Sequence, residues 1–211
     1  MSGTSVVELS AWAVTGAGAG RVARFLVERW LRTVLPSARL PPRMCELSVA
    51  VGWPALAFVD TSSLTHLVGG ALLLWWCTTV SAVDVTVRRL PNVFTMPGYA
   101  GVLLWAAVVD QLGAALVGSA MLAGVHLTMY LVSPGSIGAG DVKLALALGG
   151  STAMLGSQVW LGAAALAPVL TATAGAVTVL ARRRGPCGER TSLPHGPSMC
   201  AATMTSYIAL T

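Results

Sequence analysis

The sequence contains very few charged residues for its length. Charged side chains make up 10% of the 211 residues and hydrophobic ones 55%, whereas a soluble domain carries roughly 25% charged residues. The apolar runs are too long and too numerous for one soluble core, and in lipid each run must satisfy its own backbone hydrogen bonds, which favours helices. The runs also lack the strict alternation of a membrane β-barrel. We therefore predict an all-α, polytopic transmembrane helix bundle of about six or seven spans.

Paired cysteines and a cleavable signal are also missing. The cysteines are Cys45, Cys77, Cys187 and Cys200. They form no CxxC pair, so the sequence indicates neither a zinc ribbon nor a disulfide framework. The N-terminus has no short basic region followed by an apolar core and a small-residue cleavage site, so we predict no removable signal peptide.

The apolar runs predict the membrane helices. Their approximate bounds are 47–59, 64–83, 93–109, 112–132, 142–157, 158–181 and 199–211. We therefore expect a cytoplasmic or interfacial N-terminal segment at 1–46 and a membrane-embedded domain at 47–211. Residues 21–32 place charged and apolar side chains on opposite helical faces, which is typical of an interfacial helix or of an ordinary cytoplasmic one.

Basic residues gather in the loops that these spans place on one side. With the N-terminus inside, the arginines at 21–43, 88–89 and 182–190 and the one lysine, Lys143, share that side. The opposite loops hold Asp60 and Asp110. Because positive charge is retained on the cytoplasmic side, the distribution predicts the orientation of the bundle. Topology also accounts for the net charge of +5, so we expect no nucleic-acid partner.

Two of the four aspartates fall at the predicted cytoplasmic level. Asp84 follows the 64–83 span and Asp141 precedes the 142–157 span. Two carboxyl groups brought together from different helices share one proton, so that one acts as a base and the other polarises a carbonyl. Alternatively, both are ordinary interfacial carboxylates at helix ends. Spacing alone leaves both interpretations open.

The residues around the aspartates suit a site that admits a peptide. Gly138 and Gly140 remove side chains beside Asp141, so that a substrate backbone can approach closely. Pro91 prevents the preceding helix from running on. Lys143 either tunes the carboxyl pair or anchors its helix end, and the positive-inside tendency favours anchoring.

The histidines and one glycine-rich run do not indicate a metal-binding or cofactor-binding site. His66 and His126 lie in apolar runs without partners at ligand spacing, which favours helix packing over metal binding. We also interpret His195 as a packing residue. The run GAGAG at 16–20 lacks a preceding strand and the rest of a dinucleotide fingerprint, so it indicates no cofactor.

Two sequence elements, taken together, resemble those of a known family. D-x-x-x-x-R-L-P-N at 84–92 is followed, two spans later, by G-x-G-D-V-K at 138–143. In this order and topology, they closely resemble the prepilin peptidases, membrane aspartic proteases that process type IV prepilins and pseudopilins. LPHGPSM at 193–199 is similar to the family's proline-x-glycine-proline stretch, with His195 in place of an aromatic residue. The resemblance covers about residues 64–211.

The resemblance implies a function and a set of site residues. It makes Asp84 and Asp141 the catalytic dyad. The other motif positions are Gly138, Gly140, Lys143, Pro91 and Asn92. It further implies a prepilin-like or pseudopilin-like substrate with a basic leader and an apolar helix, cut at the cytoplasmic face of a bacterial cytoplasmic membrane without metal or organic cofactor. Members that also methylate the new N-terminus have a tetracysteine domain, which the scattered cysteines cannot supply, so we expect cleavage without methylation.

Other functions stay open as alternatives. Presenilin-like proteases share a GxGD motif but need a PAL motif after it, and the PAL at 54–56 precedes both aspartates. A proton-coupled transporter would also use membrane carboxylates, although its site is expected near the bilayer midplane. A catalytically decayed membrane subunit is the remaining alternative, because the 199–211 run is shorter than the ~20 residues of a full crossing.

Overall fold

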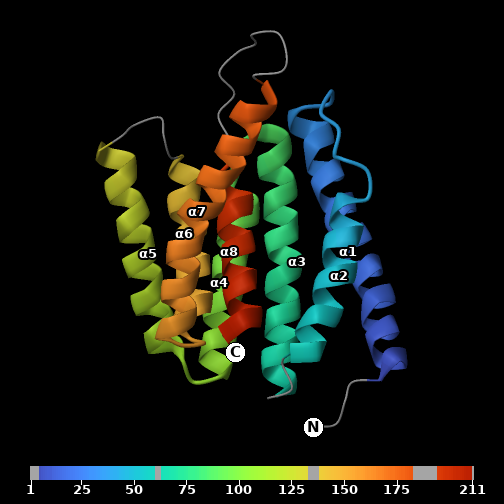
Figure 1. The fold of residues 1–211 in the computed structure, drawn as a ribbon, viewed down its shortest axis with the longest axis vertical. Helices are drawn as coiled ribbons and strands as arrows, with labels where there is room; N and C mark the ends of the chain where they lie inside the picture. The colour runs from blue at the N-terminus through green and yellow to red at the C-terminus, as the bar shows by residue number, and fades with distance from the viewer. Residues whose placement is uncertain (1–4, 60–62, 133–137, 183–193, 211) are drawn as a thin grey trace.

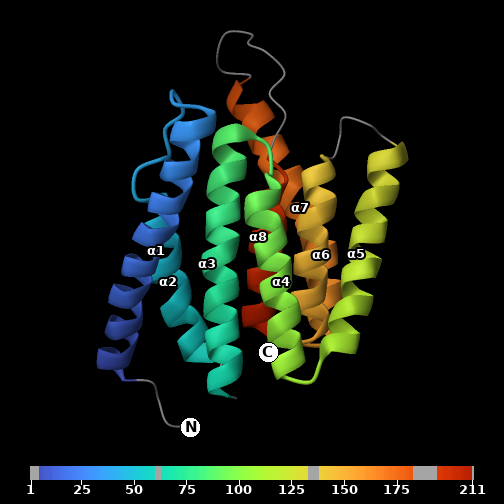
Figure 2. The same cartoon turned by 180° about the vertical axis from the view of Figure 1, so that it is seen from behind.

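The computed structural model describes residues 5–59, 63–132, 138–182 and 194–210, and within them it contains helices and no strand. The helices are α1 (Val6–Val34), α2 (Met44–Val59), α3 (Leu64–Val87), α4 (Asn92–Val108), α5 (Leu112–Val132), α6 (Ala139–Ala153), α7 (Ser157–Arg182) and α8 (Gly196–Leu210). They run up and down side by side (Figure 1), and the view from behind shows the same bundle (Figure 2). The predicted all-α helix bundle is confirmed.

The described helices have the length and surface of a multi-pass membrane protein. Among them, three are long and apolar enough to cross a membrane, Leu64–Val87, Leu112–Val132 and Ser157–Leu180, and α2 and α4 are shorter apolar helices. Large apolar side chains such as Leu104 and Leu131 are exposed on the outside of the bundle. An apolar patch of this kind is a liability in water, whereas lipid tails are as apolar as leucine.

Each predicted apolar run is largely helical over its described residues, and two shifted bounds matter for the site. The 64–83 run continues as α3 to Val87, because Arg88 takes the left-handed conformation (φ 54°) that ends the helix. The 142–157 run begins earlier, as α6 at Ala139. Asp84 and Asp141 were expected to flank their spans. They lie instead inside the last turn of α3 and the first turn of α6.

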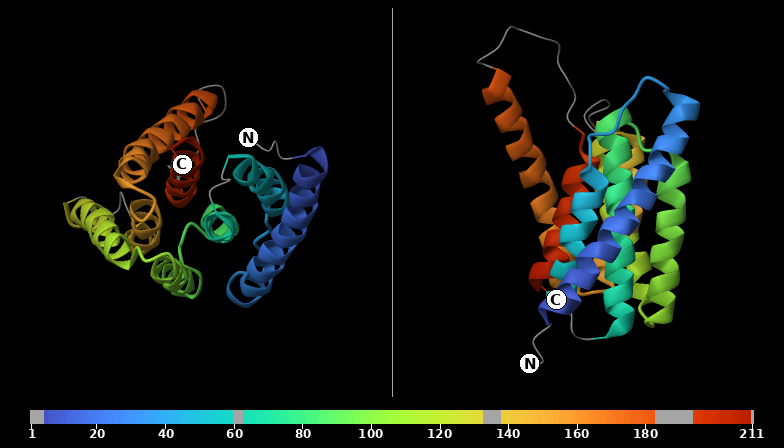
Figure 3. Two further views of the ribbon diagram at one scale, coloured as in Figure 1. Left: turned by 90° about the horizontal axis from the view of Figure 1, so that it is seen from below. Right: turned by 90° about the vertical axis from the view of Figure 1, so that its right-hand side faces the viewer.

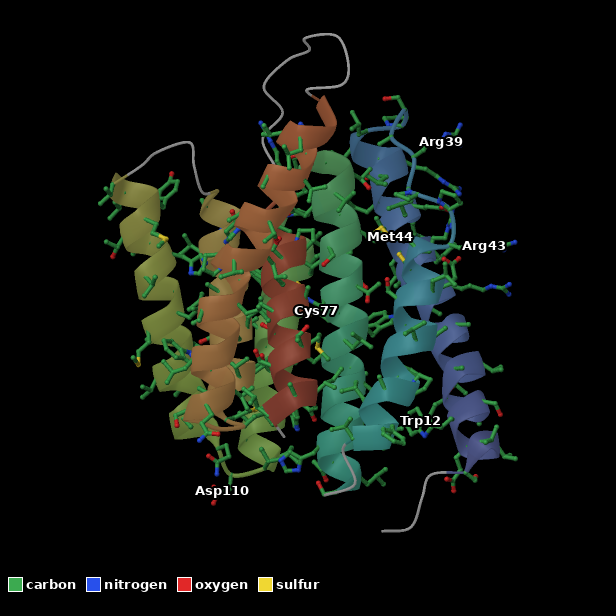
Figure 4. The ribbon with its side chains drawn as sticks, in the orientation of Figure 1. Trp12, Arg39, Arg43, Met44, Cys77 and Asp110 are labelled. Carbon is green, nitrogen blue, oxygen red and sulfur yellow. The ribbon has the colours of Figure 1, made fainter. Side chains whose placement is uncertain are left out.

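The N-terminal helix is longer than the sequence pattern predicted. Residues 21–32 are part of α1, a helix of 29 residues that starts at a capping box formed by Ser5 and Glu8. α1 packs along α2 and α3, and it runs the length of the bundle (Figure 1). Its first turn therefore lies at the end that holds Asp110, opposite the loop with Arg39 and Arg43 (Figure 4). The cytoplasmic side of the N-terminus and the division of the chain at residue 46 both stay predictions.

The glycine run at 16–20 packs α1 against α2. A Cβ added at Gly16 would lie 2.7 Å from the carbonyl oxygen of Val49, and one at Gly20 would lie 2.5 Å from that of Cys45. Gly18, between them, faces open space. Small residues four apart on one face allow membrane helices to pack closely. The run therefore has a packing role that its sequence alone did not indicate.

α3 is the central helix of the bundle. It contacts α1 and α2 on one side and α4 and α8 on the other, as the view from below shows (Figure 3, left). Val80 of α3, Leu144 of α6 and Tyr207 of α8 belong to one buried apolar core. Because this core joins α3, α6 and α8, it also fixes the relative positions of the helix ends that carry the candidate site.

Candidate active site

Asp84 and Asp141 lie at the same end of the bundle. Asp84 is 5% exposed and Asp141 is 9% exposed. The two carboxyl groups are close enough for the charge of Asp141 to act on Asp84. They are 57 positions apart in the sequence, and the packing of α3, α4 and α6 brings them together.

Each carboxyl group is held through one oxygen by the backbone N–H of a glycine. Gly196 donates to Oδ2 of Asp84 at 3.0 Å, and Gly138 donates to Oδ2 of Asp141 at 3.0 Å. Within the described part of the chain, Oδ1 of neither aspartate has a hydrogen-bond partner. One oxygen of each carboxyl is thus fixed, and the other is available to a water molecule or a substrate.

The orientation of the Asp141 side chain is explained by its place in the first turn of α6. Gly138 is the N-cap in an extended conformation, and Asp141 stands three residues later, in the first turn. An acidic side chain at this position reaches back to the N–H of the N-cap residue, and the positive end of the helix dipole also favours it. This capping interaction explains why the helix begins before Asp141 and not after it.

The two sequence motifs contact each other directly. Lys143 Nζ donates a hydrogen bond to Asn92 Oδ1 at 2.7 Å. A Cβ added at Gly140 would lie 2.8 Å from Cβ of Leu90, so the glycine lets α6 approach the loop that follows α3. Pro91, extended at the N-cap of α4 (φ −74°, ψ 145°), leads the chain out of that loop. Residues from both motifs therefore form one cluster.

Gly138 and Gly140 differ in what they face, although both were expected to keep the substrate approach open. Leu90 occupies the space beside Gly140. A Cβ at Gly138 would meet only Oδ2 of Asp141 at 3.5 Å and the nitrogen of Gly140 at 3.8 Å, and Gly138 is exposed. Gly140 is thus a packing residue, and an open approach to Asp141 stays a prediction for Gly138 alone.

Gly196 joins the third motif to the cluster. It is the first residue of α8, and a Cβ added there would lie 2.8 Å from Oδ2 of Asp84. Any larger residue would push against the carboxyl group. Gly196 was not among the site residues expected from the sequence. Its signal was its place in the proline-x-glycine-proline stretch, Pro194 to Pro197.

Two histidines lie together near Asp141. The ring centroids of His126, on α5, and His195, just before α8, are 5.9 Å apart. His195 Nδ1 lies 2.7 Å from Thr171 Oγ1 on α7, and His126 Nδ1 lies 3.0 Å from the carbonyl oxygen of Leu122. Burial lowers the pKa of the His195 imidazole, the charge of Asp141 raises it, and His126 lowers it. The spacing of the histidines in the sequence did not indicate this contact.

The described residues contain no group of three or more His, Cys, Asp or Glu side chains that could hold a metal ion. Cys45, Cys77 and Cys200 are buried free thiols. Cys77 of α3 and Cys200 of α8 belong to the same buried apolar core. The expectation of a site without metal or organic cofactor stays a prediction.

A family comparison agrees with the two motifs. Residues 71–180 match the model of the type IV leader peptidase family, and this match covers more than half of the chain and includes both Asp84 and Asp141. The chain belongs to this family. The resemblance to prepilin peptidases is therefore confirmed, and the leader peptidase is a protease. Comparisons with curated proteins and with solved structures gave no match.

Proposed function

We propose that this leader peptidase is an aspartic endopeptidase that removes a short basic leader from prepilin-like or pseudopilin-like substrates at the cytoplasmic membrane face. The observation that carries the proposal is the pairing of Asp84 and Asp141, which are both buried and each held through a single oxygen. Paired carboxyl groups with a free oxygen each are suited to hydrolysis by activated water.

In this proposal Asp84 and Asp141 act as one unit. Two close carboxyl groups withdrawn from water do not both ionise easily, so the pair holds one proton. The ionised carboxyl takes a proton from water, which attacks the scissile carbonyl carbon, while the protonated carboxyl gives its proton to the carbonyl oxygen. The tetrahedral intermediate then collapses, and the leaving nitrogen receives a proton from the dyad. The Oδ1 atoms are suited to these transfers, because glycine N–H groups occupy the Oδ2 atoms.

The proposed cytoplasmic location rests on the charges near the dyad. Arg39 lies toward the same end of the bundle as the C-terminal end of α3, and Asp110 lies at the other end (Figure 4). Lys143 is also at the dyad end, one half-turn after Asp141. Positive charge is retained on the cytoplasmic side of a membrane. A basic leader would thus reach the dyad from the cytoplasm of a bacterium while the apolar helix that follows it stays in lipid.

The depth of the two aspartates favours the peptidase over the transporter alternative. Both lie in the end turns of their helices, whereas the sites of secondary transporters lie near the bilayer midplane in broken helices. A dyad at a helix end is within reach of water, which hydrolysis consumes.

Cleavage without N-methylation is part of the same proposal. A tetracysteine domain needs its cysteines at close spacing. Cys45, Cys77 and Cys200 are instead buried in α2, α3 and α8. Cys187 lies outside the described residues. The new N-terminal residue of the product is therefore expected to be unmodified.

Co-expression with small proteins that carry a basic leader and one apolar helix tests this function. We expect the substrate band to move to lower mass, with a new, unmethylated N-terminus close to the start of the apolar helix, as measured by N-terminal sequencing and mass spectrometry. The Asp84→Asn/Asp141→Asn variant at equal membrane levels is the control. If no candidate were cut, and if the same variant changed ion or solute flux, the transporter alternative would replace this proposal.

A further inference from the structure

A cavity beside the C-terminal turns of α1 carries three arginines in its lining. It has a volume of about 170 Å³ and lies between α1 and the segment that connects α1 to α2. Its lining residues are Arg24, Glu28, Leu31, Arg32, Pro36, Ala38, Arg39 and Leu40. Figure 4 places Arg39 toward the end of the bundle where α3 ends. A pocket for a drug-sized ligand has roughly 300–1,000 Å³, so this cavity suits a smaller polar group.

Two of the three arginines have no carboxylate partner. Arg24 Nε donates to Glu28 Oε1 at 2.8 Å, and Arg24 Nη1 lies 3.6 Å from Glu46 Oε1. Both acidic side chains near the cavity are thus directed at Arg24. Among the described residues, the side chains of Arg32 and Arg39 have neither an ion pair nor a hydrogen bond, and both residues are exposed. The cavity therefore presents two unpaired guanidinium groups.

Buried apolar packing holds these two arginines on one cavity. Arg32 belongs to α1, and Arg39 belongs to the connecting segment. Their neighbours in the sequence, Leu31 and Leu40, are buried in one apolar cluster, which keeps the connecting segment against α1. Because both arginines line the cavity, an anion in it can be bound from two sides. Guanidinium groups bind phosphate through paired N–H donors, which makes a phosphate group the expected ligand.

The surface of α1 next to the cavity is apolar. Phe25 is 59% exposed and Val22 is 53% exposed. Phe25 precedes Arg32 by seven residues, so it lies on nearly the same side of the helix and about 10 Å closer to the middle of the bundle. A phospholipid has the same order of groups, because its phosphate lies at the headgroup level and its acyl chains lie deeper. A soluble phosphate ester would leave the apolar side chains uncovered.

We propose that Arg32 and Arg39 bind the phosphate of an anionic phospholipid in this cavity, while an acyl chain of the same lipid covers Phe25 and Val22. The two arginines would repel the ammonium group of a zwitterionic headgroup, which favours an anionic lipid such as phosphatidylglycerol. All four residues precede the segment at 71–180 that matches the leader peptidase family. The lipid site is thus separate from the proposed dyad, and it does not depend on what the protein cleaves.

Native mass spectrometry of the full-length protein in detergent, with phosphatidylglycerol added, tests the site. We expect a bound lipid whose Kd rises about fivefold in Arg32→Gln and in Arg39→Gln, because each basic residue near the headgroup contributes to binding. Arg29→Gln is the matched control, since it removes an exposed arginine of the same helix that does not line the cavity. Its Kd should equal that of the unmodified protein. An equal loss in all three variants, or no loss in any, would overturn the inference.

Thermal unfolding in detergent identifies the source of the phosphate. Without lipid, the three variants should unfold at the temperature of the unmodified protein, because the replaced side chains are exposed. Phosphatidylglycerol should raise the unfolding temperature of the unmodified protein and of Arg29→Gln more than that of Arg32→Gln or Arg39→Gln. Phosphatidylcholine should raise it less, and inorganic phosphate should leave it unchanged. If inorganic phosphate alone reproduced the stabilisation that depends on Arg32 and Arg39, the cavity would bind free phosphate and the lipid assignment would be wrong.

Discussion

Lys143 donates a hydrogen bond to Asn92 across 2.7 Å, although the two residues are 51 positions apart. The bond joins the first turn of α4 to α6, and so joins the two motifs that carry the aspartates. Anchoring of the helix end at the cytoplasmic face was the interpretation favoured for Lys143. The contact with Asn92 adds a second role, because it holds the helix of Asp141 against the segment that follows Asp84.

The Lys143–Asn92 bond is expected to support activity modestly. Lys143→Arg keeps a charged donor and should retain most activity, whereas Lys143→Met and Asn92→Ala should each lose about fivefold, since one hydrogen bond contributes about 1 kcal/mol net. The double variant should lose no more than either single variant in kcat/KM. Losses that multiply would show that the two side chains act independently.

Asp84→Asn and Asp141→Asn should each reduce cleavage by about 10³-fold or more. A neutral amide cannot act as the base, and the dyad works as a unit. The amide oxygen can still accept from the N–H of Gly196 or Gly138, so membrane levels and thermal unfolding should change little. Full activity in either variant would place catalysis on other residues.

Gly196→Ala is expected to damage activity more than stability. The added methyl group would lie 2.8 Å from Oδ2 of Asp84, and a displacement of about 1 Å in a catalytic group can cost about 10²-fold in rate. Gly101→Ala, in α4, is the matched control, because its added methyl group meets open space. Cleavage rates and unfolding temperatures should be measured for both. Equal activity of the two variants would contradict the role given to Gly196.

Gly20→Val should separate α1 from α2 and destabilise the protein by about 1–3 kcal/mol. The valine Cβ would lie 2.5 Å from the carbonyl oxygen of Cys45, whereas at Gly18 it meets open space. Gly18→Val in the same helix carries the same cost in helix propensity, so the difference between the two variants isolates packing. Unfolding in detergent measures that difference. Identical unfolding curves would show that α1 does not pack on α2 as described.

Labelling with a membrane-impermeant thiol reagent should reveal the course of α1. Ser5, Arg89 and Asp110 are exposed, and each can be replaced by cysteine in a background without the native cysteines. We expect Arg89→Cys to react from the cytoplasmic side and Asp110→Cys from the opposite side. Ser5→Cys should react together with Asp110→Cys, because α1 runs the length of the bundle (Figure 1). Reaction of Ser5→Cys from the cytoplasmic side would instead support the cytoplasmic N-terminus that the charge distribution predicts.

The sequence by itself determined the class of fold and the end of the bundle at which the two aspartates lie. Backbone groups in lipid must bond within a segment, so an apolar run of sufficient length specifies a helix. The 112–132 run coincides with α5. Run lengths also placed Asp84 and Asp141 at one level before any contact was known. The charged pattern predicted a helix only at 21–32, and it did not indicate that the helix begins at Val6 and that its glycines pack against α2.

Only the tertiary structure decided which groups meet at that level. The bond from Gly196 to Asp84 spans 112 positions, and no spacing rule predicts it. The same holds for the packing of Gly140 on Leu90 and for the contact of His126 with His195. Local hydropathy specifies how deep a residue lies along its helix. The direction in which its side chain points depends on the rotation of the helix about its axis, which the packing of side chains from neighbouring helices sets.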